Sequence, residues 1–183
     1  DIPALRQLRA YGAAVTSEME VFFEVCPCKI IAVTGSDGKT TTTTLIAEIL
    51  KHAGRRVWLG GNIGTPLLPV AEKMEPDDIA VVELSSFQLM GMTRSADVAV
   101  VTNLAPNHLD VHKDMAEYIA AKQNVYLHQS RTGKLVVNMD NAITDSFAES
   151  APGTVEKFSR LGRPERGVWL NGDTIYRNDT PIM

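Results

Sequence analysis

Nearly continuous apolar runs recur along this chain, separated by segments in which apolar and polar positions mix. The first run is KIIAVTG (residues 29–35), and similar runs follow at 55–61, 77–86, 96–104 and 133–140. Such runs are typical of strands that are buried on both faces of a parallel sheet. Shorter strands bounded by polar turns are predicted at 154–159, 167–172 and 174–179.

Helices are predicted between several of these strands. After the first strand, four apolar residues recur on one stripe at helical spacing, namely Leu45, Ile46, Ile49 and Leu50. Gly54 follows the end of this pattern, as glycines do at helix ends. Residues 114–130 form a second predicted helix, opened by a capping box of Asp114 and Glu117.

The alternation of strands and helices predicts an α/β fold with a doubly wound, mostly parallel sheet. Two segments depart from the alternation. Residues 13–17 (AAVTS) are strand-like after a helix-like piece at 2–12, and residues 87–96 form a short connection between two strands.

Composition narrows the class of protein. The chain has 183 residues, 44% hydrophobic and 22% charged, which suits one globular α/β domain plus part of a second. The formal charge of −4 argues against a nucleic-acid partner. No apolar run approaches the roughly 20 residues of a membrane span and no signal peptide opens the chain, so we expect a cytoplasmic protein without membrane contact, and a monomer by default. Because the sequence starts at Asp1 without a methionine, we expect it to be a piece of a longer protein.

Two cysteines, Cys26 and Cys28, lie in the sequence CPCK. A metal site needs more ligands than this pair supplies, and no cysteine or histidine follows at zinc-finger spacing. We therefore interpret both as reduced thiols.

Polar clusters follow four of the predicted strands: GSDGKT (35–40), GGNIG (60–64), ELSS (83–86) and TNLAPNHLD (102–110). Ligands of a doubly wound sheet bind beyond the carboxyl ends of its strands. The clusters therefore predict a single site.

The first cluster has the character of a phosphate-binding loop. Its candidate nucleotide-binding residues are Gly35, Ser36, Asp37, Gly38, Lys39, Thr40 and Thr41. The glycines let the backbone turn beside a phosphate, and the following helix offers free N–H groups. In such loops the lysine, here Lys39, reaches the β and γ phosphates, and the hydroxyl of the next residue, here Thr40, binds Mg²⁺. Val33 stands where the common pattern G-x-x-x-x-G-K-S/T has its first glycine, which implies a loop variant; a chance glycine turn is the alternative.

Carboxylate and hydroxyl groups follow the third long strand. Glu83 ends an apolar run, where a carboxylate beside a nucleotide holds Mg²⁺; an ion-paired glutamate is the alternative. Ser85 and Ser86 either hold a substrate or cap the next segment.

Histidines and an aspartate gather after the fourth strand. His108, Asp110 and His112 lie within five residues. Histidine beside carboxylates binds divalent cations, although Mg²⁺ prefers oxygen ligands, so surface histidines are the alternative.

Lys122 lies on an apolar stripe of the second predicted helix, with Tyr118, Val125 and Tyr126. Its amine either reaches the surface or sits in a pocket. In a pocket its pKa falls and the neutral amine becomes a nucleophile. Sequence spacing leaves both readings open.

Taken together, TGSDGKTTTT, GGNIGTPLL, VVELSSFQL, TNLAPNHLDVH and YIAAKQNVY resemble the motifs of the Mur ligases of bacterial cell-wall synthesis, over residues 31–126. The shortened glycine loop is that family's own form. NIG and SSFQL favour the member that adds D-glutamate to UDP-N-acetylmuramoyl-L-alanine, through an acyl phosphate made with ATP.

The resemblance also implies roles for individual residues. Thr40 and Glu83 would hold one Mg²⁺, and His108 would help to hold a second. Lys122 matches a lysine that is carbamylated in the family and so becomes a metal ligand. Lys39, His108 and Lys122 are the catalytic candidates. Asn62, Ser85 and Asp110 are the substrate-binding candidates, and Asn107 stands where many members have aspartate.

The family has three domains, and the resemblance implies which of them this chain contains. Residues 1–24 would end the UDP-binding domain, and residues 25–183 would form most of the central ATP-binding domain, without the C-terminal domain. We expect such a fragment to fold at least in part, to bind nucleotide weakly and not to catalyse ligation. The rival readings are a sister ligase that adds the third peptide residue, an unrelated P-loop kinase or ATPase, and a non-catalytic nucleotide-binding module.

Overall fold

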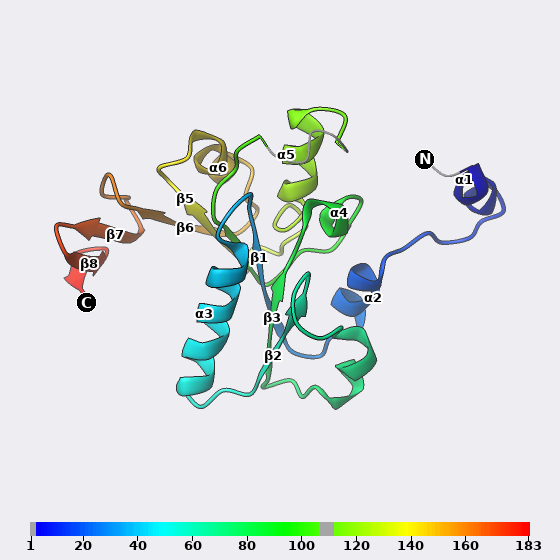
Figure 1. The fold of residues 1–183 in the computed structure, drawn as a ribbon, viewed down its shortest axis with the longest axis horizontal. Helices are drawn as coiled ribbons and strands as arrows, with labels where there is room; N and C mark the ends of the chain where they lie inside the picture. The colour runs from blue at the N-terminus through cyan, green and yellow to red at the C-terminus, as the bar shows by residue number, and fades with distance from the viewer. Residues whose placement is uncertain (1–2, 107–111) are drawn as a thin grey trace.

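The computed structural model describes residues 3–106 and 112–183. Within these ranges it contains one nine-stranded sheet in the order β2-β3-β1-β4-β5-β6-β7-β8-β9 (Figure 1). The strands are β1 (Lys29–Thr34), β2 (Val57–Gly61), β3 (Ile79–Glu83), β4 (Val98–Val101), β5 (Lys134–Asn138), β6 (Thr154–Ser159), β7 (Gly167–Asn171), β8 (Thr174–Arg177) and β9 (Thr180–Pro181).

The first seven strands pair in parallel, and only β8 and β9 run antiparallel to their neighbours. Every strand predicted from an apolar run is present. The prediction of a mostly parallel α/β fold is therefore confirmed.

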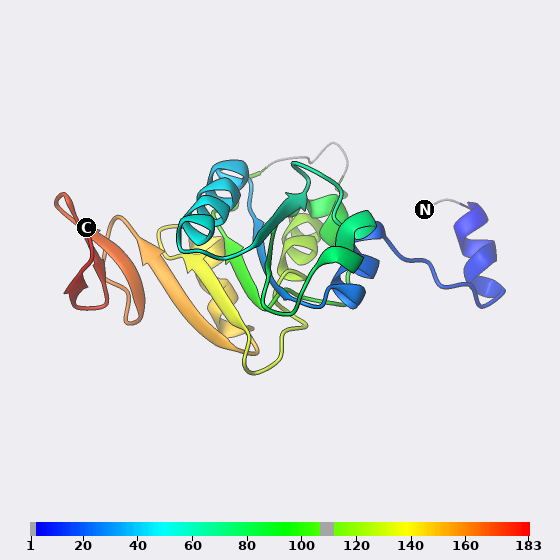
Figure 2. The same cartoon turned by 90° about the horizontal axis from the view of Figure 1, so that it is seen from below.

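The helices are α1 (Pro3–Ala10), α2 (Glu18–Val25), α3 (Lys39–His52), α4 (Ser86–Leu89), α5 (Met115–Gln123) and α6 (Ala142–Ser146), with 3₁₀ turns η1 (Leu68–Lys73) and η2 (Phe147–Glu149). In the described residues no helix combines the length and the apolar character that a membrane span needs. Figures 1 and 2 show α1 apart from the other elements at one end of the molecule, with β7 and β8 at the opposite end.

Both faces of the sheet are covered, as its strand pattern demands. Alternate side chains of a strand point to opposite faces. Ala32 and Val82 join one large core cluster with side chains of α2, α4 and α5. Val33 and Val81 are also fully buried but lie outside that cluster, and α3 packs along β1, β2 and β3. These strands are thus buried from both sides.

Three local predictions were wrong. Residues 13–17 form no strand, and the connection at 87–96 overlaps α4, which the pattern missed. In α3 the buried residues are Thr43 and Ala47, whereas Leu45 and Ile49 of the predicted stripe are exposed. The small side chains of Thr43 and Ala47 thus form the buried face of α3, which packs on β1, β2 and β3.

The two predicted helix-end signals are present, one of them in part. Gly54 follows α3 with a positive φ of 80°, and Arg55 N–H bonds back to the Leu50 carbonyl. Asp114 caps α5 by accepting a hydrogen bond from the Glu117 amide at 2.9 Å. The Glu117 carboxylate accepts from Lys113 N–H, not from the cap residue, so the capping box is half formed.

Candidate nucleotide and metal site

The loop between β1 and α3 has a backbone that only glycine permits. Gly35 has φ of 150°, and a Cβ there would lie 2.0 Å from Thr102 Oγ1. Gly38 is the N-cap residue of α3 in the left-handed region, with φ of 77°, and no side chain caps this helix. The first amides of α3 are therefore left open, which is the arrangement that binds anions at helix N-termini. Val33, in place of the usual first glycine, belongs to β1.

Neighbouring segments hold the loop in place. Ser36 Oγ lies 3.0 Å from Tyr118 Oη and donates to the Ala105 carbonyl. The Asp37 amide donates to Asn103 Oδ1, while the Asp37 side chain and Thr41 are exposed. The loop is thus fixed from the α5 side and from the end of β4. Sequence reasoning missed Asn103, although it lies in one of the polar clusters.

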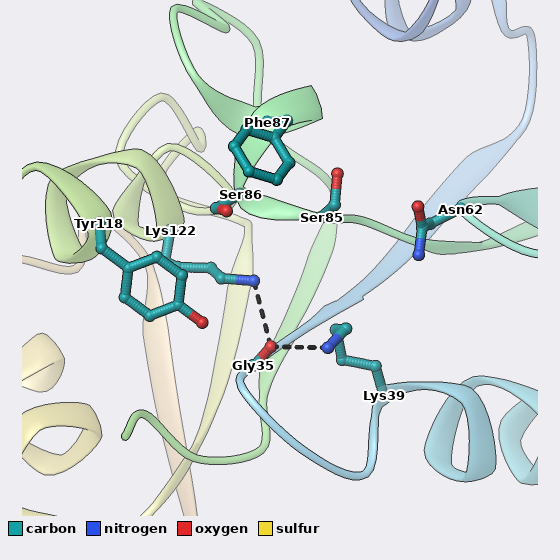
Figure 3. Close-up of a pocket in the computed structure, with 8 residues that line it drawn as sticks. All are labelled: Gly35, Lys39, Asn62, Ser85, Ser86, Phe87, Tyr118 and Lys122. Carbon is teal, nitrogen blue, oxygen red and sulfur yellow. Dashed lines mark hydrogen bonds between the residues drawn. The ribbon is translucent and has the colours of Figure 1, made fainter. Parts of the chain in front are cut away.

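Lys39 and Lys122 converge on one backbone oxygen. Lys39 Nζ donates to the carbonyls of Gly35 at 3.0 Å and Ser36 at 2.8 Å. Lys122 Nζ donates to the same Gly35 carbonyl at 3.1 Å, and to Thr34 Oγ1 at 2.9 Å. Figure 3 shows both amines directed at this oxygen.

Lys122 is buried, not snorkelling, with 2% of its surface exposed. Burial first, and then the nearby Lys39 charge, lower its pKa from 10.5 to about 7, while the Glu83 charge partly offsets the shift. Tyr118 lies beside it, with the amine 5.4 Å from the ring centroid. The pocket reading of this stripe is therefore confirmed, and a large share of the amine is neutral near pH 7.

Glu83 is a buried carboxylate, 2% exposed, beside the glycine loop. Its Oε2 accepts from Thr40 Oγ1 at 2.7 Å, and its Oε1 accepts from Asn62 Nδ2 at 2.9 Å. Both donors are neutral, and a buried charge is costly unless a cation compensates it. The hydroxyl of Thr40 and the carboxylate of Glu83 are hard oxygen ligands, so this pair fits Mg²⁺.

A cavity of about 190 Å³ lies beside the two lysines. It is lined by Gly35, Lys39, Asn62, Ser85, Ser86, Phe87, Tyr118 and Lys122 (Figure 3). The cavity thus brings together predicted site residues that follow β1, β2 and β3 with Lys39 of α3 and Lys122 of α5. Phe87 and Tyr118 were not among the candidates; the position of Tyr118 on the stripe with Lys122 was the signal for it.

Ser85 has the capping role that the sequence left open, and it also lines the cavity. Its Oγ accepts from the Gln88 amide, and the Gln88 side chain accepts from the Ser85 amide. This reciprocal pair fixes the start of α4. Ser86 instead pairs with His112, whose Nε2 lies 2.8 Å from Ser86 Oγ.

His112 is a buried residue, not a surface histidine. Its ring stacks on Phe87 at 5.2 Å and meets Tyr118 edge-on at 5.3 Å. His108 and Asp110 lie outside the described residues, as does Asn107. In the described ranges no three His, Cys, Asp or Glu side chains gather as a metal-binding group.

The glycine loop, the open helix end and the buried carboxylate, at the carboxyl ends of parallel strands, define a P-loop type nucleotide-binding α/β domain. The sequence profile described as Mur ligase middle domain matches residues 33–180. The chain belongs to this family.

Curated relatives agree over nearly the whole chain. The chain is 56% identical over 179 residues to the UDP-N-acetylmuramoylalanine–D-glutamate ligase of Acetivibrio thermocellus. The match covers 98% of this chain and 38% of that protein. The chain is 51% identical over 183 residues to the ligase of the same name from Ruminiclostridium cellulolyticum, and covers 39% of it. The chain therefore spans well under half the length of these relatives.

Solved structures share the fold. The MurF structure from Acinetobacter baumannii matches with a TM-score of 0.68 at 18% identity, over 90% of this chain and 39% of that one. A UDP-N-acetylmuramoyl-L-alanyl-D-glutamate–2,6-diaminopimelate ligase matches with a TM-score of 0.64 at 27% identity, over 78% of this chain and 34% of that one.

Proposed function

We propose that this chain is the ATP-binding part of a cytoplasmic ligase that joins D-glutamate to UDP-N-acetylmuramoyl-L-alanine. The observation that carries the proposal is the Glu83 carboxylate, held by Thr40 and Asn62 at the end of the glycine loop. The names of the relatives at 56% and 51% identity support the choice of substrates.

In the proposed reaction, ATP phosphorylates the alanyl carboxylate and the amine of D-glutamate displaces phosphate as the amide forms. The chain's own part is to bring two anions together. Lys39 and the open amides of α3 would hold the phosphates, and their positive charge offsets the repulsion between the triphosphate and the carboxylate. Residues 35–41 would line the phosphate chain. Asn62, Ser85 and Asp110 would contact the carboxylate substrate.

Thr40 and Glu83 would hold one Mg²⁺, and His108 with Lys122 would hold a second. Such ions lower the charge of the reacting phosphate and carboxylate groups. The neutral amine of Lys122 carries no negative charge and so would not attract a second Mg²⁺. Lys122 would need to carry a negative group to serve as a ligand there.

Carbamylation would supply that group. The neutral amine of Lys122 would add to CO₂, forming an N–C bond and releasing one proton, and the product carries a carboxylate. Its burial, its pKa of about 7 and the adjacent Lys39 charge all favour this modification. In ¹³C-bicarbonate buffer we expect a carbamate carbon signal in the chain without substitutions and none in Lys122→Met. A signal that persists in Lys122→Met would rule this assignment out.

Nucleotide binding is tested on the 183-residue chain itself. An ATP analogue with Mg²⁺ is titrated calorimetrically into the chain, Lys39→Ala and Glu83→Gln. We expect saturable binding in the unchanged chain, loss in Lys39→Ala, and loss of only the Mg²⁺-dependent part in Glu83→Gln. Equal binding by all three would overturn the assignment of the site.

The ligase chemistry is tested in the full-length Acetivibrio thermocellus relative, in which this chain replaces the matching segment. We expect phosphate release that requires both UDP-N-acetylmuramoyl-L-alanine and D-glutamate, and none when Lys39→Ala is introduced. ATP hydrolysis that ignores both substrates would favour an unrelated ATPase. Nucleotide binding with neither hydrolysis nor phosphate release would favour a non-catalytic module. Phosphate release that instead requires the precursor already carrying two peptide residues would favour the sister ligase that adds the third.

A further inference from the structure

Three sulfur atoms meet on the far side of the molecule from the nucleotide site. Cys26 directly follows α2, Cys28 directly precedes β1, and Met74 directly follows η1. Cys26 Sγ lies 3.6 Å from Cys28 Sγ and 4.0 Å from Met74 Sδ. The glycine loop follows the opposite end of β1, so this cluster is separate from the proposed catalytic site.

We propose that Cys26, Cys28 and Met74 form a binding site for a soft monovalent cation, with Cu(I) as the ion of choice. Thiolate and thioether ligands select such ions over Mg²⁺ or Ca²⁺, which take oxygen ligands. In the sequence, the two cysteines alone supply too few ligands for a metal site. The fold supplies the third ligand from a residue 48 positions further along the chain.

The distances from Cys26 Sγ to its two sulfur neighbours suit a shared ion. Metal–sulfur bonds measure about 2.3 Å, which places sulfur ligands about 3.8–4.0 Å apart in tetrahedral or trigonal arrangements. The two observed separations, 3.6 and 4.0 Å, bracket this range.

The surroundings suit a soft ion of low charge. Cys28 and Met74 are 6% and 4% exposed and belong to the main core cluster, and Cys26 packs against it. Cys26 itself is only partly buried, so an ion has access from solvent. On binding, each thiol that ligates the ion releases its proton, and no oxidation is involved.

The test uses the reduced 183-residue chain under anaerobic conditions, with Cu(I) supplied from a bathocuproine competitor. We expect one Cu(I) per chain. The loss of even an outer partner of a metal ligand costs about 10–100-fold in affinity, so Met74→Leu should bind at least about tenfold more weakly. Met92→Leu, another buried methionine of the same core, is the matched control and should bind unchanged.

Thermal unfolding gives a second readout. Because the ion joins α2, η1 and the start of β1 in the folded state only, Cu(I) should raise the Tm of the unchanged chain and of Met92→Leu. It should raise the Tm of Met74→Leu less, and that of Cys26→Ala not at all. Equal Cu(I) affinity in the unchanged chain and Met74→Leu would overturn the three-sulfur site, as would undiminished binding by Cys26→Ala.

Discussion

At the scale of single residues, the environment gives Lys122 chemistry that its residue type alone does not have. Its place on an apolar stripe was predictable from spacing, because helical periodicity fixes which residues share a face. Its burial was not, since a lysine stem of this length also reaches solvent. Burial, which lowers its pKa most, and the neighbouring charges of Lys39 and Glu83 come from other elements that only the fold brings close.

The pH dependence of stability tests this pKa. A lysine whose pKa falls to about 7 in the folded state costs stability fully below pH 7, and the cost declines as pH rises toward 10.5. Lys122→Met removes this dependence. In CO₂-free buffer, we expect the native chain to gain about 1.4 kcal/mol per pH unit relative to Lys122→Met between pH 7.5 and about 9.5, as measured by urea unfolding.

The exposed Lys73 provides the control, because Lys73→Met should leave the pH dependence as it is. The pKa of Tyr118 is raised above 10 by burial, so its titration does not intrude in this range. A constant difference between the native chain and Lys122→Met at all these pH values would contradict the lowered pKa.

The two cysteines should differ in reactivity although only one residue separates them. Burial, with the neighbouring Cys26, raises the pKa of Cys28 to about 12, and thiolates are the reactive form. Cys26 is partly exposed. We expect brief maleimide treatment of the metal-free chain at pH 7.5 to label Cys26 and to label Cys28 only in urea, as read by peptide mass spectrometry. Comparable labelling of both in the native chain would count against this difference.

At the scale of elements, strands were more predictable than helix faces. Parallel strands buried on both sides are continuous apolar runs, and such a run is recognisable whichever elements pack on the strand. The buried face of α3 was mispredicted because its apolar residues do not mark it; the sheet contacts Thr43 and Ala47. The short α4 was missed because Ser85 and Gln88 form a cap on a helix of one turn, which has no periodicity to detect.

Substitutions on α3 test which face is buried. Ala47 is fully buried, so Ala47→Leu should overpack the contact with the sheet and cost about 1–3 kcal/mol of unfolding free energy. Ile49 is 65% exposed, so Ile49→Gln should change stability by no more than about 0.5 kcal/mol. Urea unfolding of both variants measures the effects. The reverse order would mean that the apolar stripe, not the small-residue face, packs on the sheet.

At the scale of the whole molecule, the sequence predicted where a site forms better than how the chain divides. The carboxyl ends of parallel strands share one edge, so polar clusters after β1, β2 and β3 had to come together. No comparable rule predicts from the sequence where the folded unit begins. Met19, Phe22 and Phe23 of α2 join the same core cluster as the sheet, although their segment gives only a short acidic pattern in the sequence. The boundary near residue 24 stays a prediction.

Truncation and core substitution test that boundary together. The side chains described in α1 are mostly exposed, so removal of residues 1–12 should leave the unfolding free energy within about 0.5 kcal/mol of the full chain. Phe22 is fully buried, and Phe22→Ala should cost about 3–5 kcal/mol, with Phe22→Leu costing less because a smaller cavity is left. If α2 instead belongs to a separate unit, Phe22→Ala will leave the main unfolding transition of the sheet where it is. A single transition that shifts with Phe22→Ala and not with the truncation will place the start of this folding unit between residues 12 and 22.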